Sequence, residues 1–134
     1  MTSTSRAKLI EDPSGMVFEY LDEAEAEFLY EEVFVRRSYL KHGLTVGNGD
    51  VVVDCGANIG LFSLQCLGEA QGVIAFEPIP AIYDVLVRNL YQNSVALVKS
   101  GECPRPLALQ VAVGAGKSQD TFTFYHDNPG ESTR

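Results

Sequence analysis

The stretch that most constrains the fold is residues 51–60, which read Val-Val-Val-Asp-Cys-Gly-Ala-Asn-Ile-Gly. The three valines are β-branched and continuously apolar, which is typical of a strand buried on both faces. Asp54 places a carboxylate at the expected end of that strand, and Gly56 permits a tight turn directly after it. Gly60 allows the following helix to pack closely on the strand. A strand, a glycine turn and a helix N-terminus in this order predict a site for a nucleotide-like cofactor.

The spacing of the glycines distinguishes between two classes of cofactor. Dinucleotide-binding domains carry the pattern G-x-G-x-x-G, whereas this chain reads D-x-G-x-x-x-G from Asp54 to Gly60. Residue 58 is asparagine, where the dinucleotide pattern requires a second glycine. The loop therefore favours S-adenosylmethionine over NAD, and an NAD-binding oxidoreductase domain is the less favoured alternative.

A second acidic residue follows the next expected strand. Residues 72–78 indicate a short buried strand that ends at Glu77. Glu77 comes about 20 residues after the glycine turn, where α/β nucleotide folds place the acid that binds ribose. A carboxylate there can accept hydrogen bonds from both ribose hydroxyls. Pro80 is well placed to open a helix, and apolar residues then recur at helical spacing: Ile82, Val85, Leu86 and Leu90.

The N-terminal part is predicted to be partly helical. Residues 1–15 are polar, and we expect a flexible tail or a short leading strand up to Tyr20. Asp22 can cap a helix, with Glu25 at the reciprocal position of a capping box. This helical region should run to about Lys41, either as one helix or with a break near its middle.

The C-terminal part continues the alternation of strands and helices. Residues 107–113 predict a third parallel strand, and residues 121–125 alternate like a half-exposed strand. We therefore divide the chain into a tail over residues 1–15 and one domain portion over residues 16–134.

Composition argues against several functions. The chain has 134 residues, of which 46% are apolar and 21% charged, as in a soluble globular protein. No apolar run is long enough to span a bilayer, so no membrane partner is expected, and a net charge of −8 argues against a nucleic-acid partner. The three cysteines show no metal-ligand spacing. No metal site is therefore predicted, and the expected location is a reducing compartment, the cytoplasm.

Two central motifs resemble a known family. The segments DCGANIGLFS and AFEPIPAIYDVLVRNL resemble the FkbM-type family of S-adenosylmethionine-dependent methyltransferases. EAEFLYEEVFVRRSYLKHG and VAVGAGKSQDTFTFYHDNPGES also resemble its members, so the resemblance covers about residues 16–134. It implies a Rossmann-like class I methyltransferase fold and methyl transfer to a hydroxyl oxygen of a small molecule or natural product. By motif, the family's cofactor loop matches Asp54, Gly56, Asn58 and Gly60, and its ribose-binding acid matches Glu77.

The resemblance does not assign a catalytic residue. A base that takes the hydroxyl proton can add to the rate of methyl transfer, and four groups are candidates: Glu31, Glu32, His42 and His126. An exposed histidine without a catalytic role is the more common case, so the catalytic residue is left unknown.

The resemblance also implies further strands that this sequence does not contain. In the family, a fourth parallel strand with an acidic stretch follows the third. Without it, the strand of residues 51–54 should lie at an edge of the sheet, with unpaired backbone groups. We therefore expect the N-terminal portion of a methyltransferase domain, a fragment whose sheet a complementary chain or domain completes. A non-catalytic remnant that binds a partner chain is the alternative.

Overall fold

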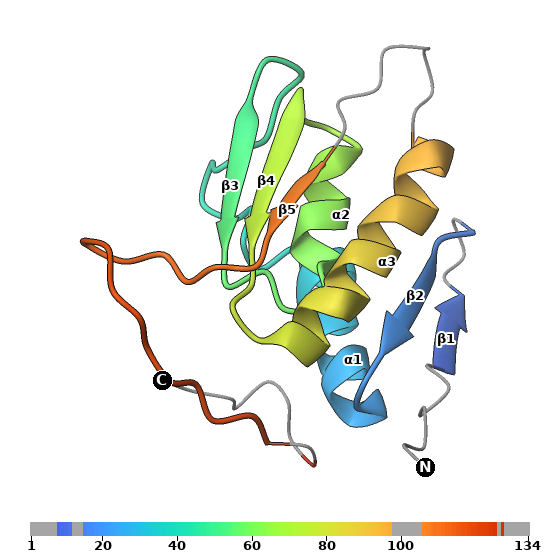
Figure 1. Cartoon of the computed structure of the whole chain (residues 1–134). Helices are drawn as coiled ribbons and strands as arrows, with labels where there is room; N and C mark the ends of the chain where they lie inside the picture. The colour runs from blue at the N-terminus through green and yellow to red at the C-terminus, as the bar shows by residue number, and fades with distance from the viewer. Residues whose placement is uncertain (1–7, 12–14, 98–105, 126, 128–134) are drawn as a thin grey trace.

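The centre of the fold is a parallel β-sheet. The structure is a computed structural model, and it describes residues 8–11, 15–97, 106–125 and 127. In this part of the chain, three strands lie side by side and parallel, in the order β3 (Val51–Cys55), β4 (Gly72–Phe76) and β5 (Leu107–Leu109). Helices alternate with these strands along the chain (Figure 1), which makes this a Rossmann-like α/β fold, as the sequence predicted.

Two helices connect the parallel strands and cover one face of the sheet (Figure 1). Helix α2 (Leu61–Leu67) joins β3 to β4, and helix α3 (Pro80–Leu97) begins at the proline that was expected to open it. The residues predicted to form the apolar face of α3 are all buried: Ile82, Val85, Leu86 and Leu90. They form one core with Leu64 of α2 and Ala75 of β4. Helical spacing therefore identified the side of α3 that faces the core.

The opposite face of β3 is uncovered in the described residues. Val51 and Val53 are 57% and 56% exposed, so the prediction that this strand is buried on both faces is wrong. Val52, which points to the other face, packs beside Cys66 and Leu67. The reason is that β3 has helices on one side only, and β4 is its one described neighbour. The edge position expected for β3 is confirmed within this part of the chain.

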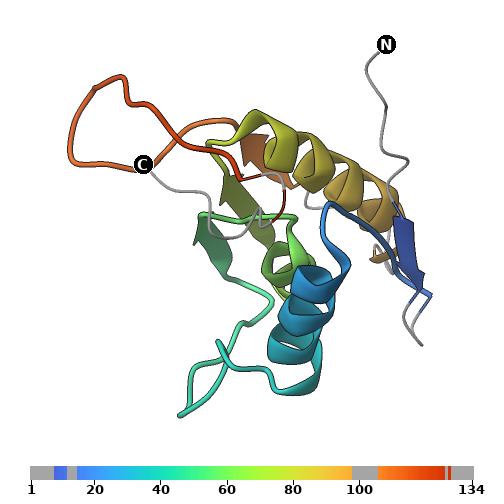
Figure 2. The same cartoon turned by 90° about the horizontal axis from the view of Figure 1, so that it is seen from below.

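An antiparallel hairpin forms a third layer, after the parallel sheet and its helices. Strand β1 (Lys8–Glu11) pairs with β2 (Val17–Tyr20), which ends at Tyr20 as expected for a leading strand. The flexible tail predicted over residues 1–15 falls mostly outside the described residues, but within it Lys8–Glu11 is a strand. Figures 1 and 2 both place α3 between this hairpin and the parallel sheet.

The helical region after the hairpin ends earlier than predicted. Helix α1 (Glu23–Tyr30) is capped by Asp22, whose Oδ1 accepts a hydrogen bond from the backbone N–H of Glu25 at 2.8 Å. It continues as a π-helical turn, η1 (Glu31–Val35), and does not reach Lys41. Arg37 has a φ of 49°, and a left-handed residue just beyond a helix end stops the helix.

Two buried asparagines of α3 attach the hairpin to the rest of the fold. Asn89 Oδ1 accepts from the backbone N–H of Glu19 at 2.7 Å, and its Nδ2 donates to the Glu19 carbonyl at 3.0 Å. Asn93 makes the same pair of bonds to Val17, at 3.1 and 2.9 Å. The Nδ2 of Asn89 also donates to the carbonyl of Ile59 at 2.8 Å. The hairpin, α3 and the loop after β3 are therefore joined by hydrogen bonds.

The C-terminal strands are shorter than predicted. β5 ends at Leu109 rather than at residue 113, and residues 121–125 form no regular strand, because Thr123 makes only an isolated bridge. Phe122 and Phe124 pack against the core on either side of Thr123. The alternation of residues 121–125 therefore reflects side-chain packing, with pairing limited to the bridge at Thr123. In the described part of the chain, no helix has both the length and the apolar character needed to cross a membrane.

Candidate functional site

The loop after β3 lies across the carboxyl end of β4. Asp54 is paired in register with Ala75, and Cys55 with Phe76, so the two strands end side by side. The backbone N–H groups of Gly56 and Ala57 both donate to the carbonyl of Phe76 at 2.9 Å. This geometry places the predicted cofactor loop at the carboxyl ends of the parallel strands, where α/β folds bind ligands.

Three residues of this loop have positive φ. Gly56 is at 78°, Asn58 at 52° and Gly60 at 92°, and only glycine, asparagine and aspartate adopt such values readily. A Cβ added at Gly56 would meet no atom within 4 Å, so the space beside it is open. A Cβ at Gly60 would lie 2.6 Å from Cδ1 of Leu86. Gly56 is therefore needed for the turn, and Gly60 for the turn and for close packing against α3.

Glu77 anchors the loop from the end of β4. Its Oε2 accepts from the backbone N–H of Asn58 at 3.1 Å, and its Oε1 accepts from that of Ile79 at 2.9 Å. Only 5% of the residue is exposed. Burial raises the pKa of its carboxyl group; the two amide bonds act in the opposite direction, and the charge of Asp54 adds a smaller increase. The acid predicted to bind ribose thus has a structural role in this loop.

Asp54 is held by the helix that follows the loop. Its Oδ2 accepts a hydrogen bond from Oγ of Ser63 at 2.6 Å, and Ser63 in α2 is fully buried. Burial raises the pKa of the Asp54 carboxyl group, and the bonds to Ser63 lower it by less. Asp54 therefore joins the end of β3 to the first turn of α2.

The raised pKa of Asp54 predicts a pH-dependent stability. Because the folded state holds this proton more tightly than the unfolded state, stability should fall as the pH rises from the ordinary value of 3.8 through the raised value. Asp54→Asn keeps an acceptor for Ser63 and removes the charge, so it should gain stability relative to the wild type over that range. Urea unfolding at a series of pH values measures this, with the exposed Asp84→Asn as the control. A constant difference between wild type and Asp54→Asn across the range would contradict it.

One contact of the loop was not predicted by the sequence analysis. Oε1 of Glu25 in α1 accepts a hydrogen bond from Nδ2 of Asn58 at 2.9 Å. The sequence indicated only a helix-capping role for Glu25. Its local pattern does not show that it will face Asn58, which is 33 positions farther along the chain. The one available signal was a carboxylate in the first turn of a predicted helix.

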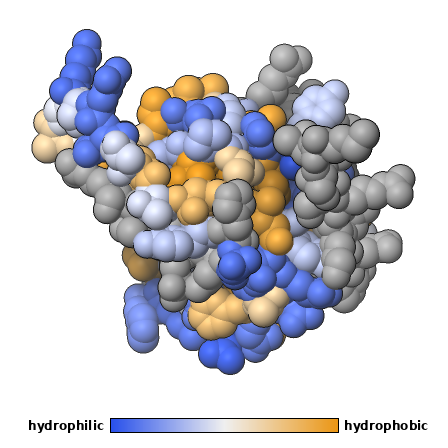
Figure 3. All heavy atoms as spheres, turned by 60° about the horizontal axis from the view of Figure 1, so that its bottom comes forward, coloured by the Kyte–Doolittle hydropathy of each residue, from blue (hydrophilic) through white to orange (hydrophobic). Residues whose placement is uncertain are grey.

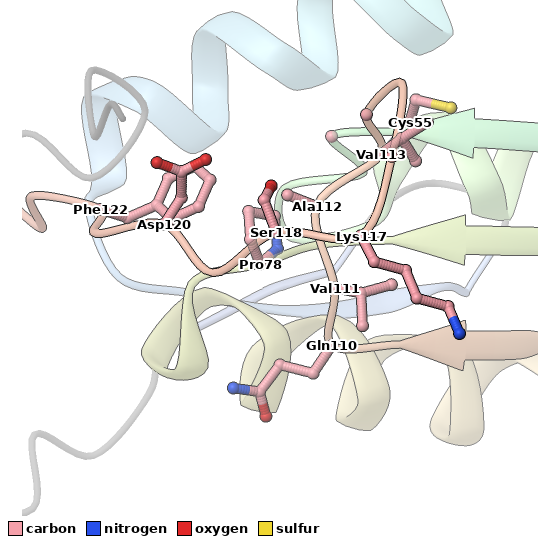
Figure 4. A pocket seen from close by; sticks show the side chains of 13 residues that line it. Cys55, Pro78, Gln110, Val111, Ala112, Val113, Lys117, Ser118, Asp120 and Phe122 are labelled. Carbon is pink, nitrogen blue, oxygen red and sulfur yellow. The ribbon is translucent and has the colours of Figure 1, made fainter.

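Two cavities adjoin the loop and share Cys55 and Gly56 as lining residues. The larger has a volume of about 740 Å³, and Figure 4 shows it between the ends of β3 and β4 and the segment that follows β5. Its lining from that segment includes Gln110, Lys117 and Asp120. Its volume lies in the range of about 300–1,000 Å³ that is typical of small-molecule sites. Figure 3 brings this side of the molecule forward and shows apolar residues near its middle with hydrophilic ones around them.

The predicted residues gather mainly around the smaller cavity. It has a volume of about 220 Å³, and α1 and η1 contribute Leu29 and Val33 to its wall. Four of the five predicted residues line it: Asp54, Gly56, Asn58 and Gly60. Glu77 lines neither of these two cavities. The structure therefore brings the loop residues together around a hollow and keeps the fifth residue beneath the loop.

The candidate bases are not brought to these cavities. Glu31, Glu32 and His42 line neither of them, and His126 lies outside the described residues. Among the residues that the structure describes, no group of three or more His, Cys, Asp or Glu side chains could hold a metal ion. The loop of residues 56–60 presents backbone groups to the cavities, and the carboxylates of Asp54 and Glu77 lie next to it. This arrangement suits binding and orientation of a ligand.

Comparison with known proteins identifies relatives of this chain, although no family model matches it. It is 44% identical over 86 residues to the 31-O-demethyl-FK506 methyltransferase FkbM of Streptomyces tacrolimicus, covering 63% of this chain and 33% of that protein. It is 35% identical over 136 residues to Methyltransferase sdnD of Sordaria araneosa, covering 99% of this chain and 48% of that protein. It is 30% identical over 111 residues to Methyltransferase 1 of Beauveria bassiana, covering 81% of this chain and 41% of that protein.

The chain spans less than half the length of each of these curated relatives. All three are named as methyltransferases, and the match to sdnD extends over almost the whole chain. The similarity of this chain to these methyltransferases agrees with its Rossmann-like sheet and with the glycine loop at the carboxyl ends of the strands. The chain belongs to the FkbM-type methyltransferase family.

Proposed function

We propose that this chain binds S-adenosylmethionine at the loop of residues 56–60 and forms the cofactor-binding portion of a methyltransferase. The observation that carries the proposal is the loop itself. Positive φ at Gly56, Asn58 and Gly60 presents backbone to two adjoining cavities at the carboxyl edge of the sheet. The family supports methyl transfer in general, and the donor is our proposal.

The residues present fit this cofactor in three respects. The open space beside Gly56 can receive a ligand against the backbone. The two cavities meet at Cys55 and Gly56, so a ligand with two chemically different ends can extend from one to the other. The carboxylate of Asp54 lines the smaller cavity. Glu77 lies beneath the loop, and each of its oxygens that accepts a hydrogen bond from a backbone amide keeps a second lone pair. We propose that those lone pairs accept hydrogen bonds from ribose hydroxyls.

The proposed reaction is methylation of a hydroxyl oxygen on a small molecule or natural product. When bound, the cofactor supplies a methyl group on a positively charged sulfur. The chain contributes orientation and exclusion of water, which are the main demands of a direct displacement. The Streptomyces relative is named for 31-O-demethyl-FK506, a substrate named for a missing O-methyl group. That name supports a hydroxyl acceptor, and it leaves the acceptor of this chain open.

Isothermal titration calorimetry tests the cofactor assignment. S-adenosylmethionine and S-adenosylhomocysteine should bind the 134-residue chain with one site each, and NAD should not bind. Binding of NAD in preference to both would support an oxidoreductase domain and contradict the proposal. Binding of none of the three would support a non-catalytic chain that binds a partner.

We also propose that the exposed edge of β3 pairs with a strand from a complementary chain or domain. An unpaired strand edge is a template for such pairing, and Val51 and Val53 beside it are more than half exposed. The isolated chain should therefore self-associate, which light scattering of the purified protein measures. A monomer at all concentrations would contradict this part of the proposal.

The free thiols of Cys55 and Cys66 support the proposed cytoplasmic location.

A further inference from the structure

We infer that Glu25 is a positioning residue for the cofactor loop and acts through Asn58. The inference rests on the proposed function, because it assigns Glu25 to the same site. Its basis is the 2.9 Å hydrogen bond from Nδ2 of Asn58 to Oε1 of Glu25, which connects α1 to the loop across 33 positions of sequence. Glu25 does not belong to the motif, and it lines neither cavity.

Asn58 is the residue through which the loop can be held in place. Its backbone N–H donates to Oε2 of Glu77 at 3.1 Å, and its own Oδ1 accepts from the backbone N–H of Ile59 at 2.7 Å. These bonds require Oδ1 to face an amide donor and Nδ2 to face a carboxylate, which defines the orientation of the side-chain amide. Asn58 therefore links the carboxylate of Glu77, just after β4, to the carboxylate of Glu25 in α1. A shift of the loop would break one of these two bonds.

Glu25 is itself held on a rigid element. Its backbone N–H is bonded to the capping side chain of Asp22 at 2.8 Å. Farther along, the rings of Tyr30 and Phe34 pack on Phe18 of β2, with ring centres 5.8 Å from that of Phe18 in both cases. A carboxylate on an anchored helix loses little freedom when it forms a hydrogen bond, so the bond is an effective restraint.

The same helix forms the wall opposite the loop. Leu29 of α1 and Val33 of η1 line the smaller cavity, and Asn58 and Gly60 line it from the loop. The bond between Glu25 and Asn58 therefore connects the two walls of one cavity. Its loss should leave the loop folded and allow it to fluctuate, so ligand affinity should fall before global stability does.

The test uses four variants of the full 134-residue chain. Glu25→Ala removes the acceptor. Asn58→Asp places a second carboxylate against Glu25 and keeps a residue that tolerates positive φ. The double variant Glu25→Gln with Asn58→Asp exchanges donor and acceptor at unchanged total charge, so it restores a hydrogen bond between the two positions. Glu27→Ala, an exposed carboxylate of the same helix, is the control.

Two readouts separate this inference from the proposed function. Amide hydrogen exchange at Asn58, measured by NMR without ligand, should become faster in Glu25→Ala and stay unchanged in Glu27→Ala. Affinity for S-adenosylhomocysteine should fall about tenfold in Glu25→Ala, as expected for loss of a hydrogen bond to a charged group. It should fall at least as far in Asn58→Asp and recover in the exchanged pair, whereas a general loss of stability would give no such recovery.

Two results would overturn the inference. One is an amide hydrogen-exchange rate at Asn58 that is the same in Glu25→Ala as in the wild type. The other is a double variant that binds S-adenosylhomocysteine no better than Asn58→Asp does. If the wild type fails to bind S-adenosylhomocysteine while Glu25→Ala still accelerates exchange at Asn58, the proposed function is wrong. In that case the positioning of the loop by Glu25 is nevertheless supported.

Discussion

Replacing Gly60 by alanine should lower the free energy of unfolding by about 3 kcal/mol. Two effects add at this position. A φ of 92° is unfavourable for any residue that carries a Cβ. The new Cβ would also lie 2.6 Å from Cδ1 of Leu86. Leu86 is fully buried in the core, so its side chain cannot rotate away without displacing closely packed neighbours.

Gly56→Ala is the matched comparison for this prediction. Its φ of 78° carries the same kind of backbone strain, but its Cβ would enter open space. We expect a loss of about 1 kcal/mol from strain alone, together with weaker ligand binding because the Cβ fills the space beside the backbone. Urea unfolding of both variants measures the difference. Equal losses at the two positions would show that Leu86 yields and that close packing at Gly60 contributes nothing.

Replacing Glu77 by alanine should lower the free energy of unfolding by about 2 kcal/mol. The change removes the acceptor for two backbone N–H groups, those of Asn58 and Ile79. A buried donor without a partner costs about 1–3 kcal/mol. Part of this loss is offset, because burial raises the pKa of Glu77 and the variant no longer buries a charge.

Glu77→Ala should also weaken binding of S-adenosylhomocysteine, both by loosening the loop and by removing the proposed acceptor for ribose. Calorimetric unfolding and ligand titration of one preparation give both quantities. Glu69→Ala is the control, because its carboxylate forms an exposed ion pair with Arg37, and such pairs contribute little. A Glu77→Ala protein as stable as Glu69→Ala would contradict the anchoring role. An unchanged dissociation constant would contradict the ribose assignment.

Local features of the fold could be predicted from the sequence because their causes are local. The valines before Asp54 specify a strand, and the glycines at 56 and 60 specify positive φ at those positions. The start of α3 at Pro80 follows from the backbone geometry of proline. Each of these elements is determined by the conformational preferences of a few adjacent residues.

Features that depend on distant residues could not be predicted in this way. The exposure of Val51 and Val53 depends on what covers the sheet, and a strand's own residues do not specify this. The bonds from Asn89 to Glu19 and from Asn58 to Glu25 join residues 70 and 33 positions apart. The side-chain amide of an asparagine is compatible with many partners, so the position of an asparagine in the sequence does not show which residue it will contact.

The most direct test of the cofactor site is a titration of the 15N-labelled chain with S-adenosylhomocysteine, followed by NMR. Our account predicts that the backbone amide signals of Gly56, Asn58 and Gly60 shift first and saturate together, and that NAD leaves them unchanged. Signals of exposed residues on the outer side of α3, such as Tyr91, serve as the internal reference. Saturating S-adenosylhomocysteine that leaves the three loop amides unmoved, or NAD that shifts them equally, would contradict the assignment of this loop as the cofactor site.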